Sequence, residues 1–411
     1  MSTLRQRFGR PLRLGLIGGG PGSWIGAMHR SAAEMDGWFR ATAGVFSSDA
    51  ARSRAAGVEL GFDAARSYGT VAEMLLAERA RADGIDAVAI MSPNDTHYAH
   101  AAAALDAGLD VICDKPVTHS HAEALDLAAR VRGHKRLFAI AHAYSAYPMT
   151  RHARHLVRVG AIGVVRLVQV EYIQSGLATR VEAGTLTNRL RWVLDPRRSG
   201  QALVMSAIGC HTQQLASFVV GQPVARVVAD VGSLMPGREV VDHVSALIEF
   251  GSNQAADGGA RGTFTVTQAA AGGENDIRLR VYGDKGLLDW NHREAGYLKL
   301  ALQGEPARLI GRGDPDLPPE VTAAGRTPRG HPEGLREAFA NLYAELAQER
   351  MAITLGEPVP AFPYPRIEDG AHTMAFIEAC LASQREGRWV AVAGANDGRA
   401  AAGAEKTGEP G

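Results

Sequence analysis

The chain has 411 residues, so two domains are expected, because single hydrophobic cores stop growing at about 250–300 residues. Hydrophobic residues make up 46% and charged residues 21%, a globular composition that excludes an intrinsically disordered chain. The formal net charge is zero, without the clustered excess of Lys and Arg that nucleic-acid binding requires. No apolar run reaches the roughly 18 residues of a membrane helix, and the N-terminus shows a short leader without a signal-peptide segment.

Cysteine usage points to the same class of protein. The three cysteines, Cys113, Cys210 and Cys380, are widely separated along the chain. Their spacing matches neither a metal-ligand motif nor a disulfide framework. These observations predict a soluble cytoplasmic protein with no metal site and with neither a nucleic-acid nor a membrane partner.

The first third of the chain alternates short apolar runs with helical segments. Strands are expected at 13–17, 40–46, 85–91, 109–113 and 136–141, and helices at 24–35, 49–57, 70–82, 97–107 and 119–133. Strands that alternate with helices of this length are typical of βαβ units and a parallel sheet. We therefore predict an α/β fold that begins with a Rossmann dinucleotide-binding domain over residues 12–145.

The pattern changes near residue 150. A helix at 150–160 precedes strands expected at 164–174, 224–232, 241–250, 262–268, 277–283 and 286–290. Their alternation of apolar and polar residues is typical of antiparallel strands with one exposed face. A glycine-rich turn is expected at 255–262, a long surface loop at 313–332, and helices at 333–350 and 367–385. This predicts a second α/β domain over 146–390 with an open, predominantly antiparallel sheet, and a disordered tail at 391–411.

A glycine cluster at 18–26 follows the first predicted strand and precedes a helix. In that context glycines let the backbone approach a pyrophosphate, and the helix N-terminus offers unpaired N–H groups. The spacing departs from G-x-G-x-x-G, because Ser23 occupies the third glycine position and Gly26 comes later. The alternative is an ordinary strand-to-helix turn. We predict that NAD or NADP binds here, with contacts from Gly18, Gly20, Gly22, Ser23 and Ile25.

The end of the second strand bears on the choice between NAD and NADP. An acidic residue at this position binds the ribose 2′-hydroxyl in many Rossmann domains. This chain has Ser47 and Ser48 there, with Asp49, Arg52 and Arg54 next. Small hydroxyls with arginines nearby would accommodate a 2′-phosphate, whereas a helix N-cap at Ser48 with solvated arginines is an equally weighted alternative. NAD and NADP both stay open, with Ser47, Ser48 and Arg52 as predicted contacts.

Two further segments carry a family resemblance. Residues 92–97 (SPNDTH) and 107–116 (AGLDVICDKP) resemble the P-N-x-x-H and A-G-x-x-V-x-x-E-K-P motifs of the glucose–fructose oxidoreductase, inositol dehydrogenase and MocA (Gfo/Idh/MocA) family. The loop GGGPGSWIGAMHR resembles a branch of this family with an extra residue in the glycine turn. Further similarity at WVLDP (192–196), GCH (209–211) and HPEGLREAFANLY (from 331) extends the resemblance over roughly residues 12–390.

The resemblance implies a function. Members of the family transfer hydride between a nicotinamide and a secondary alcohol carbon, usually of a sugar, an inositol or a related polyol. The resemblance also implies a homodimer or homotetramer built through the open sheet, as the half-exposed strands themselves suggest. It places Ser92, Asn94, His97, Asp114 and Pro116 at the cofactor. Asp114 stands where the family usually has Glu, and for His97 helix capping is an alternative role.

Hydride removal from a secondary alcohol requires a group that takes the hydroxyl proton. Lys115 can do this when burial and the nicotinamide charge favour its neutral form, and its place after a parallel strand puts it at the ligand crevice. The alternative is a surface lysine paired with Asp114. The resemblance adds His211 as a second catalytic residue. Further expected substrate contacts, for which structural roles are the alternative, are His142, Tyr144, Trp192 and His211.

One motif departs from the family pattern. Residues 206–211 read Ser-Ala-Ile-Gly-Cys-His, so Ala207 stands where the G-D-x-G-x-H motif has an aspartate, and Val193 replaces an arginine. An acid–base group contributes about 10²–10⁴-fold to a rate, so this loss matters. The leading prediction is an NAD(P)-dependent dehydrogenase or reductase acting on a CH–OH group. The alternatives are a cofactor-binding protein with lost or altered catalysis, and an imine or aldehyde reductase.

Overall fold

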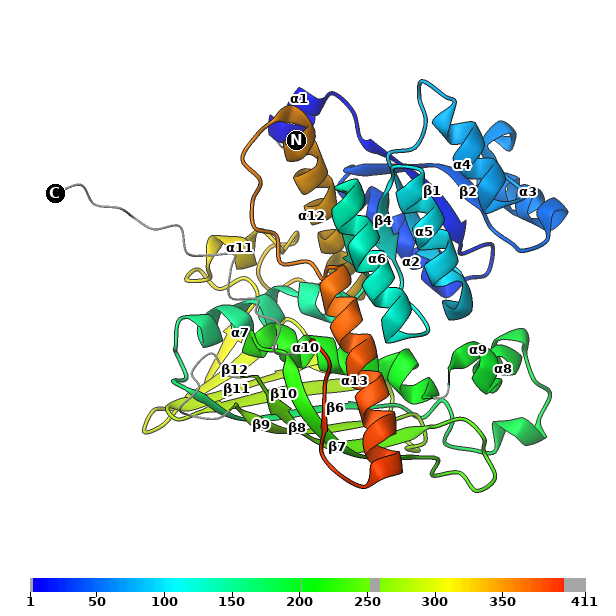
Figure 1. The fold of residues 1–411 in the computed structure, drawn as a ribbon. Coiled ribbons are helices and arrows are strands. Elements are labelled where there is room, and N and C mark those ends of the chain that lie inside the picture. Colours follow the sequence, from blue (N-terminus) through cyan, green and yellow to red (C-terminus); the bar gives the residue numbers. More distant parts are fainter. Residues whose placement is uncertain (1–2, 201, 252–258, 395–411) are drawn as a thin grey trace.

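The structure is a computed structural model that describes residues 3–200, 202–251 and 259–394, and it contains two β-sheets with helices packed on them (Figure 1). The first sheet has five parallel strands in the order β2-β1-β3-β4-β5. Every residue of β3 and β4 is buried, because helices cover both faces of the sheet. The strands are β1 (Leu12–Gly18), β2 (Phe39–Val45), β3 (Ala87–Met91), β4 (Asp110–Cys113) and β5 (Phe138–Ile140). The predicted Rossmann sheet is confirmed.

The helices of this layer begin at side-chain caps that the sequence supplies. The oxygens of Ser23, Asp49, Thr70 and Ser120 accept backbone N–H groups at the starts of four helices. Such caps satisfy donors that have no partner inside the helix. The helices are α2 (Trp24–Met35), α3 (Ala50–Glu59), α4 (Val71–Arg79), α5 (His97–Asp106) and α6 (His121–His134).

The strand order produces a switch point at the carboxyl edge of the first sheet. Strands β2 and β3 lie on opposite sides of β1, so the chain changes direction across the sheet at β1. Ligands of doubly wound sheets bind at the carboxyl ends of the strands next to such a switch point. The glycine cluster follows β1 directly and therefore lies at this edge of the sheet.

The second sheet has nine strands in the order β13-β12-β11-β10-β6-β9-β8-β7-β14. All neighbours are antiparallel except β6 and β9, which confirms the predicted open, predominantly antiparallel sheet. Helices α7 (Pro148–Arg158), α10 (Cys210–Val220) and α13 (Ile367–Glu386) pack on one face, between this sheet and the Rossmann domain (Figure 1). The predicted strands are β6 (Val165–Ile173), β7 (Val224–Gly232), β8 (His243–Phe250), β9 (Arg261–Thr267), β10 (Asp276–Gly283) and β11 (Gly286–Asn291).

Several elements were not predicted from the sequence. They are α1 (Thr3–Phe8) in place of a short leader, α8 (Asn188–Val193), α9 (Pro196–Ser199), β12 (Tyr297–Leu302), β13 (Arg308–Gly311) and β14 (Val390–Ala391). Most are too short to show a period, and β14 exists only because it pairs with β7. Residues 255–258 of the predicted turn at 255–262 lie outside the described residues, and β9 already begins at Arg261. The predicted tail lies outside the described residues from residue 395 on.

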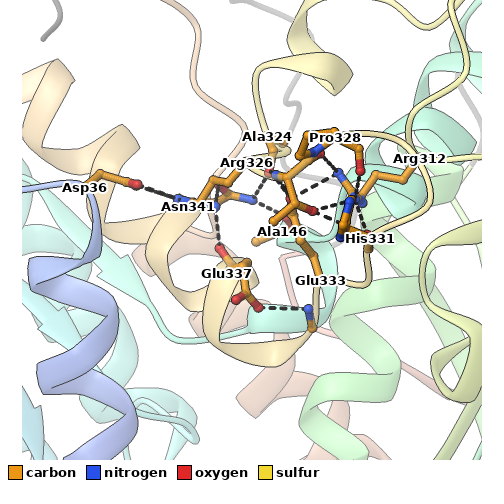
Figure 2. Close-up of polar contacts among 12 residues, drawn as sticks. Asp36, Ala146, Arg312, Ala324, Arg326, Pro328, His331, Glu333, Glu337 and Asn341 are labelled. Atoms are coloured by element: carbon orange, nitrogen blue, oxygen red, sulfur yellow. Dashed lines mark hydrogen bonds and ion pairs between the residues drawn. The ribbon is translucent and has the colours of Figure 1, made fainter.

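The segment predicted as a surface loop, 313–332, is largely irregular and exposed, but polar side chains anchor it at both ends. It contains the short helix α11 (Pro319–Thr322). Figure 2 shows Arg312 and Arg326 at the centre of its polar contacts. Arg312 pairs with Glu333 at 3.0 Å, with side chains only 8% and 3% exposed. Arg326 reaches Asp36 of the Rossmann domain at 2.6 Å and Asn341 at 2.9 Å. The loop therefore joins the two domains.

Helix α12 (Leu335–Leu355) crosses the predicted domain division. It packs against α2 of the Rossmann domain, and the hydroxyl of Tyr343 lies 2.7 Å from Nδ1 of the buried His29. Residues far along the chain thus complete the first layer, and the division at residues 145 and 146 stays a prediction. In the part of the chain that the structure describes, no helix has the length and apolar character to cross a membrane.

Candidate active site

The predicted cofactor residues come from four neighbouring strands. The glycine loop follows β1, Ser47 and Ser48 follow β2, Ser92 follows β3, and Asp114 follows β4. Because these strands are parallel and adjacent, their carboxyl ends share one edge of the sheet. The structure therefore brings together segments that are separated by almost 100 positions in the sequence.

The glycine loop is shaped by close backbone contacts. Gly18 ends β1, and Gly20 lies against the Phe46 carbonyl that follows β2. A Cβ atom at Gly26, inside α2, would lie 2.3 Å from the Gly19 carbonyl oxygen, so only glycine lets the helix approach the loop this closely. At Gly22, with φ of 77°, an added Cβ would meet nothing within 4 Å, and the backbone there is open. This open, side-chain-free turn fits a dinucleotide pyrophosphate.

The start of α2 is fixed from both sides. Ser23 is its N-cap, and the Ser23 hydroxyl accepts the Gly26 N–H at 3.1 Å. Arg30, farther along α2, donates to the Gly19 carbonyl at 2.5 Å. Ile25 is half-buried beside the loop. The glycine pattern includes Gly26 but predicts neither its close approach to Gly19 nor the contact of Arg30, because both depend on the packing of α2 against the loop.

The region after β2 gives each arginine a partner. The N-cap of α3 is Asp49 and not Ser48, and its carboxylate accepts the Arg52 N–H at 2.8 Å. Nε of Arg52 donates to the Ser47 hydroxyl at 2.9 Å. Arg54 is held by both carboxylate oxygens of Glu73. Arg52 and the exposed Ser48 therefore lie beside Ser47 at the crevice, an arrangement that suits a ribose hydroxyl or a 2′-phosphate.

His97 connects the two motif loops. It is 1% exposed, and its two ring nitrogens lie 2.8 Å from the Pro116 carbonyl oxygen and 2.9 Å from the Ser92 carbonyl oxygen. Burial lowers the pKa of His97. The ring thus holds the loops together, and direct contact with a cofactor stays a prediction. Asn94 opens the adjacent 3₁₀ turn η2 (Asn94–Thr96) and is half-buried.

Lys115 reaches across the domain interface. Its backbone N–H donates to the Asp114 carboxylate at 2.7 Å, and the Lys115–Pro116 peptide bond is cis. The side-chain Nζ instead donates to the backbone carbonyl of Ala207 at 2.6 Å. Lys115 is therefore not a surface lysine paired with Asp114, since its amine points at the start of α10.

Two histidines meet beside this amine. His142 is 1% exposed, and its Nδ1 lies 3.4 Å from Nδ1 of His211, in the first turn of α10. Burial and the nearby Lys115 charge lower the pKa of His142 to about 3 and the pKa of His211 well below its ordinary value. Both imidazoles are therefore neutral at neutral pH, and each can donate one hydrogen bond and accept another.

Aromatic and amide side chains border the histidine pair. The Tyr144 ring meets the His211 ring edge to face at 5.0 Å, and its hydroxyl lies 2.7 Å from the Tyr172 hydroxyl. Tyr172 donates to the Asn275 side chain at 2.6 Å, and the His292 ring also meets the Tyr144 ring edge to face, with centroids 5.0 Å apart. Sequence reasoning missed Tyr172, Asn275 and His292, which lie in or beside antiparallel strands without any motif. Uncharged hydroxyl and amide groups of this kind suit a polyhydroxylated ligand.

Trp192 lies apart from the cluster of Lys115, His142 and His211. It is on α8, and among the described residues it forms no hydrogen bond or ring contact with that cluster. The following helix α9 does reach the Rossmann domain: Arg198 lies 3.7 Å from Asp95, and its carbonyl lies 3.0 Å from Nε2 of His119. The segment α8–α9 therefore lies beside the predicted cofactor edge (Figure 1).

Sequence relatives decide the family. Residues 12–142 match "Oxidoreductase family, NAD-binding Rossmann fold", and residues 150–289 match "GFO/IDH/MocA C-terminal domain". The oxidoreductase YfiI of Bacillus subtilis is 32% identical over 390 residues, which cover 93% of this chain and 97% of YfiI. The chain belongs to the Gfo/Idh/MocA oxidoreductase family. Its N-terminal domain is therefore an NAD(P)-binding Rossmann domain.

Solved structures agree with this assignment over nearly the whole chain. An inositol dehydrogenase homologue from Azotobacter vinelandii in complex with NAD+ superposes with a TM-score of 0.88 at 31% identity, covering 95% of this chain and all of the other. The same homologue with NADH and myo-inositol gives a TM-score of 0.85 at 31% identity, covering 94% of this chain and 98% of the other. The predicted family, fold class and NAD(P) cofactor are confirmed.

Proposed function

We propose that this protein is an NAD(P)-dependent dehydrogenase or reductase that transfers hydride between nicotinamide and a secondary alcohol or ketone. The substrate class is a sugar, a glycoside, an inositol or a related polyol. The observation that carries the proposal is the convergence of Lys115, His142 and His211 beside the cofactor edge of the Rossmann sheet. The relative crystallised with NADH and myo-inositol supports the polyol class.

The side chains divide the proton chemistry between them. A bound nicotinamide supplies the site that accepts or donates the hydride. The neutral form of Lys115 takes the proton from the substrate hydroxyl, and the ammonium returns it when a ketone is reduced. His211, neutral and fixed by His142, orients that hydroxyl with a hydrogen bond. General acid–base groups of this kind contribute about 10²–10⁴-fold.

The cofactor contacts follow the predicted assignment. Pyrophosphate would lie on the turn at 18–26, and the adenosine ribose at the end of β2. The remaining motif residues would line the crevice toward the nicotinamide. The full proposed set is Gly18, Gly20, Gly22, Ser23, Ile25, Ser47, Ser48, Arg52, Ser92, Asn94, His97, Asp114, Lys115 and Pro116.

The test is a screen of sugars, glycosides and inositols with NAD+ and with NADP+, followed by the absorbance of reduced nicotinamide. On any substrate found, Lys115→Ala should lower kcat by at least about a hundredfold, because the proton acceptor acts in the transition state. Its cofactor Kd should stay within about tenfold of the wild-type value, while Lys135→Ala, at an exposed lysine that follows α6, should change neither constant. Nearly full kcat in Lys115→Ala would move the proton-transfer role to His211.

A second function is favoured by Ala207 and Val193. Neither side chain can supply the carboxylate or guanidinium that the family resemblance leads one to expect at these positions. A cofactor-binding protein with lost or altered catalysis, or an imine or aldehyde reductase, would explain both substitutions. Tight cofactor binding together with no turnover on the whole polyol panel would favour these alternatives over the main proposal.

We also propose a homodimer or homotetramer through the open face of the nine-stranded sheet. Leu167 and Leu247 lie on that face and are 38% and 52% exposed, and a small hollow between them and β10 is lined by polar side chains. Light scattering that shows a monomer at micromolar concentration would contradict this.

The three cysteines are buried and unpaired, which is compatible with the predicted cytoplasmic location.

A further inference from the structure

Helix α10 does not begin with a regular helical turn. It is preceded by the π-helical turn η5 (Met205–Gly209), in which the Cys210 N–H donates to the Met205 carbonyl five residues earlier. A π turn inserts one extra residue, redirects the backbone groups around it, and occurs frequently at functional sites. This turn lies directly before α10, whose second residue is His211.

Side chains contact three consecutive carbonyls of this turn. Sγ of Cys210 donates to the Ser206 carbonyl at 3.2 Å, and the Thr212 hydroxyl donates to the Ile208 carbonyl at 3.0 Å. The carbonyl between them, that of Ala207, accepts Nζ of Lys115 at 2.6 Å. The two outer contacts come from α10 itself, whereas the central one comes from the other domain.

We propose that the Ala207 backbone carbonyl is the group that positions the Lys115 amine, and that this neutral acceptor keeps the amine available for proton transfer. The inference rests on the proposed function and names a positioning element within that site. In this proposal the backbone of the π turn, and not the side chain at position 207, positions the amine.

The chemistry of the two protonation states supports this role. A neutral amine has two N–H groups and one lone pair. One N–H remains on the Ala207 carbonyl, and the lone pair takes the substrate hydroxyl proton while the hydride leaves for the nicotinamide. After the transfer, the ammonium keeps the same hydrogen bond. A carboxylate partner would favour the charged form of the amine much more strongly than a neutral carbonyl does, and would therefore oppose the action of the amine as a base.

The groups that face Lys115 are almost all uncharged. They are His97, His142, Cys210 and His211, with the Asp114 carboxylate accepting the Lys115 backbone N–H. Burial lowers the pKa of the three histidines and raises the pKa of Cys210 to about 11. In the described part of the chain, the side-chain hydrogen bond of Lys115 is the one to Ala207.

Competitive acetylation of the folded protein measures this arrangement without a substrate. The rate at which Lys115 is labelled is followed against pH by peptide mass spectrometry, with the exposed Lys135 of the same molecule, which follows α6, as the internal reference. Ala207→Asp adds a carboxylate next to the amine, and Ala207→Asn adds the same bulk without charge. The labelling midpoint of Lys115 should rise by about one pH unit or more in Ala207→Asp. It should stay within about 0.3 unit of the wild-type value in Ala207→Asn, because no charge is added.

A backbone substitution tests the carbonyl directly. The α-hydroxy analogue of isoleucine at position 208 turns the Ala207 carbonyl into an ester carbonyl, which is a weaker acceptor. The released Lys115 should then be labelled at least about twofold faster at high pH, since a weaker hydrogen bond holds the neutral amine. The matched control is the α-hydroxy analogue of leucine at position 215, farther along α10, which should leave the labelling unchanged.

These outcomes are separate from those of the proposed function. Equal labelling midpoints in Ala207→Asp and Ala207→Asn, or unchanged labelling in the 208 ester, would overturn the inference even if the enzyme oxidises a polyol. A wild-type protein that turns over no polyol would instead overturn the proposed function, while the labelling experiment would still report on Lys115 and Ala207.

Discussion

Gly26→Ala tests whether the contact between α2 and the glycine loop shapes the cofactor site. The added Cβ would lie 2.3 Å from the Gly19 carbonyl oxygen and 2.6 Å from the Gly19 Cα. Non-bonded heavy atoms pack at roughly 3.5–4.0 Å, so the loop or the helix must move by about 1 Å or more. The atoms that must move are backbone atoms of Gly19, which lies between Gly18 and Gly20. The displacement therefore changes the shape of the turn that would face the pyrophosphate.

The expected result is a loss of cofactor affinity larger than the loss of fold stability explains. The Kd for NAD(H) and NADP(H) should rise at least tenfold, which is about 1.4 kcal/mol of binding free energy. Overpacking of this kind costs about 1–3 kcal/mol of unfolding free energy, so the variant should remain folded with a lower Tm. Calorimetric titration of each cofactor and a thermal melt of the same sample measure both quantities.

Gly133→Ala is the matched control. Gly133 lies in the last turn of α6, where an added Cβ meets nothing within 4 Å. This change should leave cofactor binding untouched and stabilise the helix by about 0.5–1 kcal/mol. If Gly26→Ala binds both cofactors within twofold of the wild-type Kd, the close contact does not shape the site and the reasoning is refuted.

Three further outcomes are expected. Arg326→Ala should lower the unfolding free energy by about 2–4 kcal/mol in urea titrations, since it removes hydrogen bonds of a charged side chain to Asp36 and to α12. The control Arg329→Ala, which removes a side chain that is 72% exposed, should lower it by less than about 0.5 kcal/mol. Equal losses of unfolding free energy in the two variants would contradict this. Arg52→Ala should weaken NADPH binding by about tenfold and NADH binding by less than twofold, because Arg52 lies beside Ser47 at the predicted ribose position. Calorimetric titration measures both affinities, and equal weakening would show that Arg52 does not recognise the 2′-phosphate. Burial lowers the pKa of His142 from 6.5 to about 3, so only the unfolded chain takes up a proton as the pH falls below about 6.5. The unfolding free energy should therefore drop by about 2 kcal/mol less between pH 7 and 5 in His142→Gln than in the wild type, and identical pH profiles would show that His142 does not contribute.

The sequence predicted the Rossmann domain well because its signals are local. Five apolar runs separated by helical segments specify a parallel sheet, and β3 and β4 were found because strands buried on both faces read as continuous apolar runs. The motif residues at 92–97 and 107–116 identified the family for the same reason, since each motif is a short contiguous segment. Short elements such as α8, α9 and β14 were not predicted, because a helix of a few residues or a strand of two is too short to show a repeating pattern of apolar residues.

The chain by itself thus determined the order of the elements, the edge at which the cofactor residues gather, and the residue types available for proton transfer. Tertiary structure alone decided their partners. No sequence pattern predicts that the Lys115 amine donates to the Ala207 carbonyl and not to Asp114. Nor does one predict that Arg326 connects its loop to Asp36, which is nearly 300 positions away in the sequence. The physical reason is that hydrogen bonds and buried contacts depend on distance in space, whereas sequence patterns record only the period of each element and the residues next to it.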